Sequence, residues 1–338
     1  MTGGPGGALG PPHVYAIPLT TRFRGITVRE GLVIPGAAGW GEFCPFPEYD
    51  DGTAAPWLAG AVEAATLGWP APLRDRVPVN VTVPVVGPER AHDLVAGSGC
   101  RTAKVKVADH PASLPEDLAR LEAVRDALGP DGAVRIDVNG AWDVDHAAAV
   151  LPALDKAAGG LEYVEQPCPT VDDLAALRRR TSVPIAADEA IRRAPDPVAA
   201  VRSVTRRQAA DVVVVKCAPL GGVRAALRVA EAAELPCVVS SALETSVGLA
   251  AQLALAGALP SLDHACGLGT VRLLTGDLVP AQASLVPADG FLPVPRTPPA
   301  PDAGLLDWWA QPEPDRVRWW VERLRRVARL LARPTTGI

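Results

Sequence analysis

The chain has 338 residues, of which 48% are hydrophobic and 21% are charged, so it can form one large domain or two with sizeable cores. Its net charge of −5 gives no electrostatic case for binding nucleic acid. The longest apolar stretch, 247–260, is interrupted by Gln252 and is too short to cross a bilayer. The sequence therefore argues against a nucleic-acid-binding protein and against a membrane-spanning one.

The cysteines and the N-terminus both indicate a reducing compartment. The six cysteines are scattered, without CxxC pairs or zinc-ligand spacing, which predicts reduced and mostly buried thiols. Residues 1–12 are rich in Gly and Pro, which predicts a loose terminus, and they lack the basic start and apolar core of a secretory signal. We therefore expect a cytoplasmic protein.

The first part of the chain predicts a small α+β domain. Three strand-like runs are separated by turn residues, which is typical of an antiparallel meander: His13–Leu19, Ile26–Ile34 and Gly39–Phe43. An Ala-rich helix is predicted from Pro56 to Leu67, and the proline-rich stretch 69–78 reads as a boundary. We expect residues 1–78 to form an N-terminal α+β capping domain, completed by the end of the chain.

Beyond the boundary, strands and helices alternate. The predicted strands are Val79–Val86, Thr102–Val107, Ala133–Asn139, Tyr163–Gln166, Pro184–Glu189, Asp211–Lys216, Cys237–Ala242 and, weakly, Leu262–Cys266. The predicted helices are Leu114–Leu128, Asp145–Ala157, Val171–Arg180, Asp196–Ala209, Gly222–Ala233 and Glu244–Ala258. Alternation of this kind implies a parallel sheet covered by helices. Eight strand candidates predict an α/β fold for residues 79–280, a modified (β/α)₈ TIM barrel with an imperfect last unit.

Residues 281–338 must return to the first domain or wrap the barrel. They contain Trp308-Trp309 and a predicted helix near Asp315–Leu331, which carries Trp319-Trp320 and a row of arginines. We interpret these residues as packing and as a solvated face. A basic amphipathic helix is also the pattern of a membrane-surface or partner-binding helix, and this alternative stays open.

Lysine is rare in this chain, which has 29 arginines and four lysines: Lys104, Lys106, Lys156 and Lys216. Arginine stays charged in proteins, whereas lysine can lose its proton when it is buried or near another cation. Lys104 and Lys106 lie two residues apart in a β-branched run, so both project from the same face of a strand. The pattern indicates a lysine base, with a half-buried strand carrying two surface-reaching lysines as the alternative. We assign no role to Lys156.

Charged residues gather at the strand ends, where barrel enzymes place their chemistry. Strand two ends with Lys106 and strand six with Lys216. Strands three to five, between them, end in acidic or amide residues: Asp137, Asn139, Glu165, Asp188 and Glu189. Strands two and six face each other across the mouth of an eight-stranded barrel, so one lysine approaches each face of a ligand held between them.

Three acids on successive strands predict a metal site. Adjacent strands lie about 4.8 Å apart, so Asp137, Glu165 and Asp188 are expected to converge on one Mg²⁺ ion. Without a cation they would repel one another. A metal beside a lysine of lowered pKa suits removal of a proton from a carbon next to a carboxylate.

These motifs resemble those of the enolase superfamily over nearly the whole chain. Thr102-Ala-Lys104-Val-Lys106 is similar to its KxK motif. The three ligand motifs of the family resemble Arg135–Trp142, Val164–Pro167 and Ala187–Glu189. Val215-Lys216 resembles its sixth-strand lysine, and the absence of histidine from 238–244 favours the muconate-lactonising branch over the mandelate-racemase branch.

Within that branch the chain is most similar to the actinobacterial o-succinylbenzoate synthase family, Mg²⁺-dependent dehydratases of menaquinone biosynthesis. The similarity rests on three stretches: Thr21–Gly25, Trp40–Glu42 and Ser240–Ser246. N-acylamino acid racemases and dipeptide epimerases also resemble it. Epimerases usually carry Asp-x-Asp at strand eight, where this chain has Asp263-His264-Ala265. A non-catalytic scaffold is the alternative of another class, and loss of Mg²⁺ binding would favour it.

The resemblance implies a role for each candidate residue. Lys106 would remove the α-proton, Lys216 would stabilise the enediolate from the opposite face, and Lys104 would keep the pKa of Lys106 low. Asp137, Glu165 and Asp188 would bind Mg²⁺. The predicted substrate-binding residues are Arg22, Arg24, Asn139, Ser240, Ser241 and Gly267, the last through backbone amides of a Gly267-Leu-Gly269 nest, for which a plain turn is the alternative. The expected partner is a small carboxylate, and a monomer is favoured.

Overall fold

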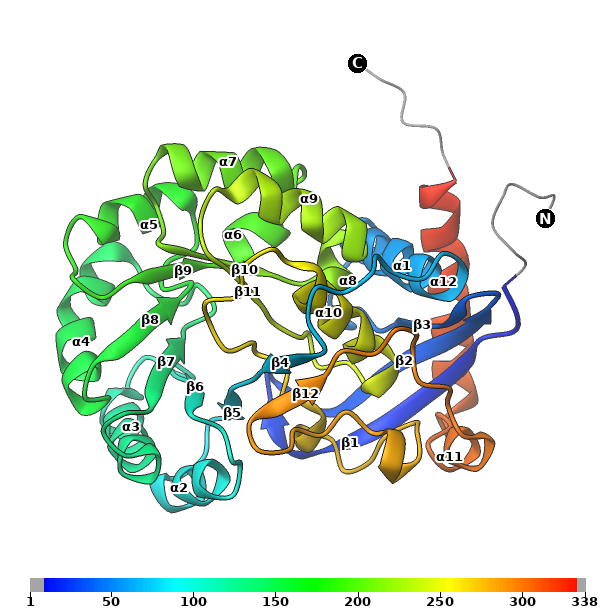
Figure 1. The fold of residues 1–338 in the computed structure, drawn as a ribbon, viewed down its shortest axis with the longest axis horizontal. Coiled ribbons are helices and arrows are strands. Elements are labelled where there is room, and N and C mark those ends of the chain that lie inside the picture. The colour runs from blue at the N-terminus through cyan, green and yellow to red at the C-terminus, as the bar shows by residue number, and fades with distance from the viewer. Residues whose placement is uncertain (1–8, 333–338) are drawn as a thin grey trace.

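The computed structural model describes residues 9–332, so residues 1–8 of the expected loose terminus lie outside the described residues. Figure 1 shows two parts: parallel strands ringed by helices, and a smaller α+β part built from both ends of the chain. No helix within residues 9–332 is long and apolar enough to span a membrane.

The smaller part begins with the predicted antiparallel meander. Its strands pair in the order β1 (His13–Phe23), β2 (Ile26–Gly36) and β3 (Gly39–Phe43). Helix α1 (Asp51–Thr66) packs closely on β3. Gly41 permits this approach, because a Cβ atom at that position would collide with the carbonyl oxygen of Ala61.

Two local predictions in this part were wrong. Strand β1 runs on to Phe23, which pairs with Ile26 across a tight turn. Helix α1 begins at Asp51 and contains Pro56, because the carboxylate of Asp50 caps the helix by accepting a hydrogen bond from the Thr53 amide at 2.7 Å. The expected boundary contains a short strand, β4 (Arg76–Pro78).

The larger part holds a seven-stranded parallel sheet in the order β11-β10-β9-β8-β7-β6-β5. Its strands are β5 (Val81–Val83), β6 (Thr102–Lys106), β7 (Ala133–Asp137), β8 (Leu161–Glu165), β9 (Ile185–Ala187), β10 (Val212–Val215) and β11 (Cys237–Val239). The predicted alternation of strands and helices is confirmed. The strands are shorter than the apolar runs from which they were predicted.

Helices cover the outer side of this sheet (Figure 1). They are α2 (Pro88–Ala96), α3 (Leu114–Leu128), α4 (Val144–Ala157), α5 (Val171–Arg178), α6 (Glu189–Arg192), α7 (Pro197–Arg206), α8 (Cys217–Leu220), α9 (Val223–Ala233) and α10 (Ser246–Ala258). The sequence pattern did not predict α2, α6 or α8. Helices α6 and α8 begin directly after strand ends, so they follow the functional side chains.

Residues 262–266, weakly predicted as the eighth strand, form no regular strand. Single bridges join Cys266 to Val79 and Gly267 to Ser240, which connects the first strand of the sheet with the last. The amide of Asn80 donates to the carbonyl of Cys266 at 2.9 Å, and the amide of Gly267 donates to that of Val239 at 2.8 Å. The barrel is therefore closed by isolated bridges at its eighth position.

The inside of the barrel is apolar along the strands and charged at their carboxyl ends. Tyr163, Ala186, Val212, Val214 and Val238 form a small buried cluster. Side chains alternate across a strand, so the residue two positions after such an inward-facing one also points inward. This spacing gives Glu165 after Tyr163, Asp188 after Ala186 and Lys216 after Val214.

The end of the chain returns to the smaller part. Two 3₁₀ turns, η1 (Val271–Leu273) and η2 (Ala281–Ala283), precede β12 (Phe291–Pro293), which pairs with β4. Helices α11 (Ala303–Trp308) and α12 (Pro314–Leu331) follow.

Helix α12 packs on the smaller part, and α1 is its main neighbour. Trp320 on α12 is fully buried, and its ring meets that of Phe43 edge-on at a centroid distance of 6.3 Å. Trp308, at the end of α11, is 76% exposed and belongs to the solvated face rather than to the packing.

Candidate active site

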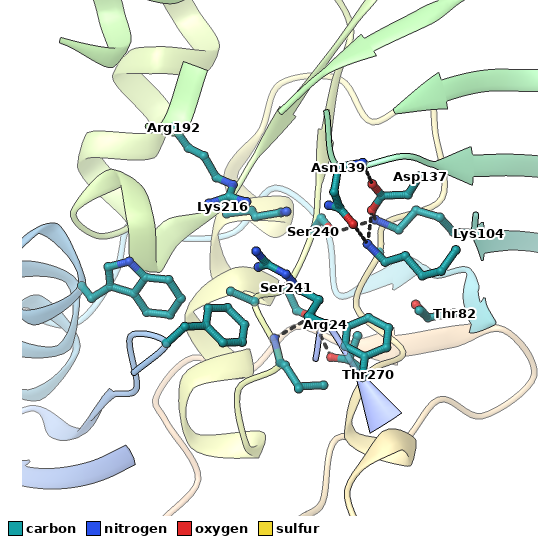
Figure 2. Close-up of a pocket in the computed structure, with 17 residues that line it drawn as sticks. Arg24, Thr82, Lys104, Asp137, Asn139, Arg192, Lys216, Ser240, Ser241 and Thr270 are labelled. Carbon is teal, nitrogen blue, oxygen red and sulfur yellow. Dashed lines mark hydrogen bonds and ion pairs between the residues drawn. The ribbon is translucent and has the colours of Figure 1, made fainter. Parts of the chain in front are cut away.

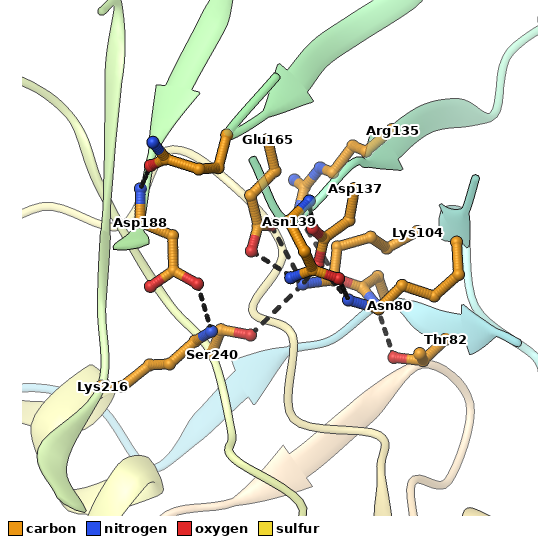
Figure 3. A network of polar contacts seen from close by, with 12 residues as sticks. Asn80, Thr82, Lys104, Arg135, Asp137, Asn139, Glu165, Asp188, Lys216 and Ser240 are labelled. Atoms are coloured by element: carbon orange, nitrogen blue, oxygen red, sulfur yellow. Dashed lines mark hydrogen bonds and ion pairs between the residues drawn. The ribbon is translucent and has the colours of Figure 1, made fainter. Parts of the chain in front are cut away.

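The candidate site stands at the carboxyl ends of the barrel strands. Lys106 on β6 pairs in register with Asp137 on β7, and Asp137 pairs with Glu165 on β8. Three charged residues thus lie in one row across three neighbouring strands. Asp188 follows β9 and Lys216 follows β10, and Figure 3 shows both at the same end of the barrel as Asp137 and Glu165.

Lysine side chains hold the carboxylates in place. Lys104 donates to Glu165 Oε2 at 2.9 Å and to Asp137 Oδ2 at 3.3 Å. Lys106 donates to Asp137 Oδ2 at 2.5 Å and to Asn139 Oδ1 at 2.8 Å. These contacts place Lys104 deeper and Lys106 nearer the opening, where it is less buried.

Lys216 approaches from the other side of the barrel. It donates to Asp188 Oδ2 at 2.6 Å, and the same carboxylate accepts a bond from Arg192 Nε at 2.9 Å. Lys106 and Lys216 line one pocket but pair with different carboxylates. The two lysines therefore enter the pocket from different strands, each beside its own carboxylate.

The two lysines of β6 have pKa values shifted in opposite directions. Burial lowers the pKa of both, but Glu165 and Asp137 more than offset this for Lys104, whose pKa is raised. For Lys106 the effect of burial persists, because Asp137 raises the pKa while the charge of Lys104 lowers it. Lys104 therefore stays an ammonium ion, and Lys106 loses its proton more readily than an ordinary lysine.

The pKa values of the three acids are also shifted in opposite directions. Burial raises the pKa of Asp137 and of Asp188, but Lys106 and Lys104 in one case, and Arg192 and Lys216 in the other, bring the net value below normal. Burial and the charge of Asp137 together raise the pKa of Glu165 to about 7, despite the opposing effect of Lys104. Glu165 is thus the acid whose negative charge is least balanced.

The three acids share one end of the barrel without meeting at one point. Across residues 9–332, no three acidic, histidine or cysteine side chains gather closely enough to hold an ion, because each carboxylate is turned toward a lysine. Their chemistry nevertheless fits a hard divalent cation. Asp137, Glu165 and Asp188 are at most 1% exposed, offer only oxygen donors, and leave one negative charge poorly balanced.

The predicted substrate-binding residues divide between two neighbouring cavities. Arg24, Asn139, Ser240, Ser241 and Gly267 line the pocket that contains the lysines (Figure 2). Arg22 lines only the second cavity, which shares Phe23, Arg24, Lys106 and Asn139 with the first. The structure therefore separates Arg22 from Ser240, Ser241 and Gly267, whereas Arg24 and Asn139 line both cavities.

Gly267 contributes space to the pocket. Its amide donates to Val239, and the amide of Leu268 donates to Cys266 at 2.9 Å, so both are already bonded within the protein. A Cβ atom at Gly267 would lie 2.6 Å from Ser240 Oγ. The absence of a side chain is what the fold requires here, which favours the plain turn over the anion-binding nest.

Sequence reasoning missed several pocket residues: Phe23, Phe46, Trp57, Thr82, Arg192, Leu243 and Thr270. Thr82 lies on the first barrel strand and Arg192 follows Asp188 by one helical turn, so position could have indicated both. Thr270 accepts or donates a hydrogen bond with Ser241 at 2.7 Å, a contact between segments far apart in sequence. No local sequence pattern predicts a contact between segments so far apart.

Comparison with protein families agrees with this geometry. Residues 88–299 match the family described as enolase C-terminal domain-like, and residues 14–65 match the one described as enolase N-terminal domain-like. Muconate lactonizing enzyme from Pseudomonas fluorescens superposes with a TM-score of 0.77 over 90% of this chain and 99% of that one. At 22% identity this likeness shows the fold.

Relatives of higher identity share one name. The o-succinylbenzoate synthase of Thermobifida fusca is 64% identical over 84% of this chain and 87% of its own length. That of Mycolicibacterium smegmatis is 52% identical over 92% and 93% of the respective lengths. The chain therefore belongs to the enolase superfamily and, within it, to the o-succinylbenzoate synthase family.

Proposed function

We propose that this chain catalyses the Mg²⁺-dependent syn elimination of water from 2-succinyl-6-hydroxy-2,4-cyclohexadiene-1-carboxylate, which yields o-succinylbenzoate for menaquinone biosynthesis. One observation carries the proposal. In a member of this family, Lys106 and Lys216 line one pocket, and buried strand-end carboxylates lie between their strands. A positioned base beside stabilised negative charge is what removal of an α-proton requires.

Lys106 acts as the base and later as the acid. Its neutral amine takes the proton from the carbon that bears the ring carboxylate, and the electron pair of that C–H bond moves toward the carboxylate. The pair then forms the new ring double bond as the neighbouring C–O bond breaks. The departing hydroxide takes the proton back from Lys106 and leaves as water. One lysine on one face performs both transfers, so the elimination is syn.

Two other lysines stabilise charge. Lys216 reaches the pocket from β10 and would offset the negative charge that develops on the substrate, partly by cation–π contact with the ring. Lys104 is bonded to Asp137 and Glu165 and stays protonated, so it favours the neutral form of Lys106. The lowered pKa of Lys106 agrees with its role as base.

Enzymes of the enolase superfamily generally use a divalent metal ion. In this chain Asp137, Glu165 and Asp188 would hold Mg²⁺, and Asn139 would stay beside them through its bonds to Lys106 and Glu189. A bound cation supplies positive charge beside the substrate carboxylate as that group gains electron density.

The pocket must open to admit this substrate. Its cavity measures about 30 Å³, which is room for about one water molecule, whereas the neighbouring cavity measures about 300 Å³. Phe23 and Arg24, at the turn between β1 and β2, line both. Movement of this turn would join the cavities, and its return would enclose the succinyl chain and exclude water.

The epimerase alternative is less well supported. An epimerase would need acids near strand eight to bind a substrate ammonium. Here His264 is hydrogen-bonded to Glu162 at 2.8 Å, and the carbonyl of Ala265 accepts a bond from Arg135 at 2.6 Å. Neither Asp263 nor its neighbours line the pocket.

The first test is turnover by the purified full-length protein, followed by ultraviolet absorbance. We expect dehydration with Mg²⁺, loss of turnover after treatment with EDTA, and recovery when Mg²⁺ is restored. Folded protein shown to bind Mg²⁺ but inactive on this substrate would contradict the proposal. Solvent deuterium appearing at the α-carbon of an N-acylamino acid or dipeptide would then assign the racemase or epimerase activity, and failure to bind Mg²⁺ would favour a scaffold.

A further inference from the structure

Arg192 lines the pocket but has no part in the proposed proton transfer. It is the last residue of α6, is 8% exposed, and points into the pocket beside Lys216 (Figure 2). Its Nε donates to Asp188 at 2.9 Å and its Nη2 to Glu189 at 2.6 Å. A guanidinium has five N–H donors, so Arg192 can bond Asp188, Glu189 and the side chain of Tyr49 and still offer a donor to a ligand in the pocket.

Arg24 reaches the same pocket from the smaller part of the molecule. Its backbone adopts φ +50° at the β1–β2 turn, and its guanidinium carbon lies 4.5 Å from the centre of the Phe46 ring. Nη2 donates to the hydroxyl of Tyr49 at 3.4 Å. Arg24 forms no ion pair with any carboxylate between residues 9 and 332.

The positive charges of Arg24 and Arg192 both act on the hydroxyl of Tyr49. Burial raises the pKa of its hydroxyl, but the charges of Arg24 and Arg192 bring the pKa down to about 8. Two guanidinium groups held near one phenol repel each other, and an anion placed between them would relieve that repulsion. The other charged residues of the pocket have the same bias, because Asp137 is the one acid among lining residues that include Arg24, Lys104, Lys106, Arg192 and Lys216.

We propose that Arg192 and Arg24 together bind a second carboxylate of the substrate, the one at the end of the succinyl chain. Arginine suits this task, because its planar fork binds carboxylates in a bidentate manner. The ligand class is a dicarboxylate whose second acid group is carried on a flexible chain. This inference rests on the proposed function and adds to it a binding site formed between the barrel and the β1–β2 turn.

The test compares two ligands by isothermal titration calorimetry of the Mg²⁺-loaded protein. One is o-succinylbenzoate, and the other is its analogue with a primary amide in place of the succinyl carboxylate. We expect the wild-type protein to prefer the diacid by roughly 10- to 100-fold, as for charge-assisted hydrogen bonds. Arg192→Gln should lose about tenfold or more of this preference while its affinity for the amide changes little.

Two further variants separate recognition from structure. Arg24→Gln should also reduce the preference for the diacid, and it leaves the contacts of Arg192 with Asp188 and Glu189 in place. Arg193→Gln is the matched control, because Arg193 is the next residue, is exposed and does not line the pocket. It should keep the wild-type preference.

Equal weakening of both ligands by Arg192→Gln would overturn the proposal, since Arg192 would then act only through Asp188 and Glu189. If that variant does not fold, an unchanged preference in Arg24→Gln would also overturn it. Wild-type protein that dehydrates the precursor but binds both ligands equally would refute this site alone. Protein that neither dehydrates the precursor nor binds o-succinylbenzoate would refute the proposed function itself.

Discussion

Lys104 and Lys106 lie two positions apart on β6, and their ammonium groups have different surroundings. Lys104 touches both Asp137 and Glu165, so a proton on it is strongly favoured. Lys106 has one carboxylate partner and a second cation nearby, so its proton is easier to lose. The same residue type thus serves as a fixed charge at one position and as a proton carrier at the other.

Replacing Lys106 by Ala should abolish turnover, because no other side chain would take the α-proton from that face. Loss of a general base costs roughly 10²- to 10⁴-fold or more in rate. Lys156→Ala is the matched control, since Lys156 is exposed on α4, and it should retain full activity. Steady-state rates, circular dichroism and Mg²⁺ titration check this, and substantial activity in the Lys106 variant would contradict its role.

Strand β7 is tied at its base to the segment that stands in for strand eight. Arg135 is fully buried and donates to Glu162 at 2.5 Å and to the carbonyl of Ala265 at 2.6 Å. Glu162 on β8 also bonds His264 at 2.8 Å. Side chains therefore supply part of the closure that a regular eighth strand would give.

Glu162→Gln should destabilise the fold at neutral pH and have little effect in acid. Burial raises the pKa of Glu162, but the hydrogen bonds and charges of His264 and Arg135 outweigh burial and lower this pKa to about 2. A lowered pKa contributes stability that is fully present above the unfolded value near 4.5 and is lost as the pH falls toward 2. Urea unfolding at neutral pH should show a loss of about 1–3 kcal/mol. A difference between wild type and variant that does not narrow below pH 4.5 would argue against an ionised Glu162.

The two parts of the molecule meet where β3 contacts the start of α10. Glu42 accepts hydrogen bonds from the Tyr15 hydroxyl, the amide and hydroxyl of Thr245, and the amide of Gly248. Arg29, fully buried on β2, donates to the carbonyls of Ala242 and Leu243 at 3.1 and 2.9 Å. Ala242 and Leu243 line the active-site pocket, so the smaller part holds a wall of a pocket that the barrel carries.

Glu42→Gln should therefore weaken both stability and substrate binding. A glutamine amide would face backbone donors with donors of its own, and leaving such buried groups unpaired costs about 1–3 kcal/mol each. We expect a lower urea midpoint and a raised KM with a smaller change in kcat. The exposed Glu48 offers the control variant Glu48→Gln, which should behave as wild type. An unchanged urea midpoint and KM for the Glu42 variant would show that this contact does not support the pocket wall.

The sequence by itself determined the barrel and the charged row at its mouth. Parallel strands in register place their last residues side by side, so Lys106, Asp137 and Glu165 could be assigned together before any coordinates. Tertiary structure alone decided the rest. No local sequence pattern predicts the bridges at Cys266 and Gly267 or the pairing of β4 with β12. Each of these contacts joins segments far apart along the chain. The approach of Arg24 to Arg192 depends in the same way on how the two parts pack, which periodicity and composition do not encode.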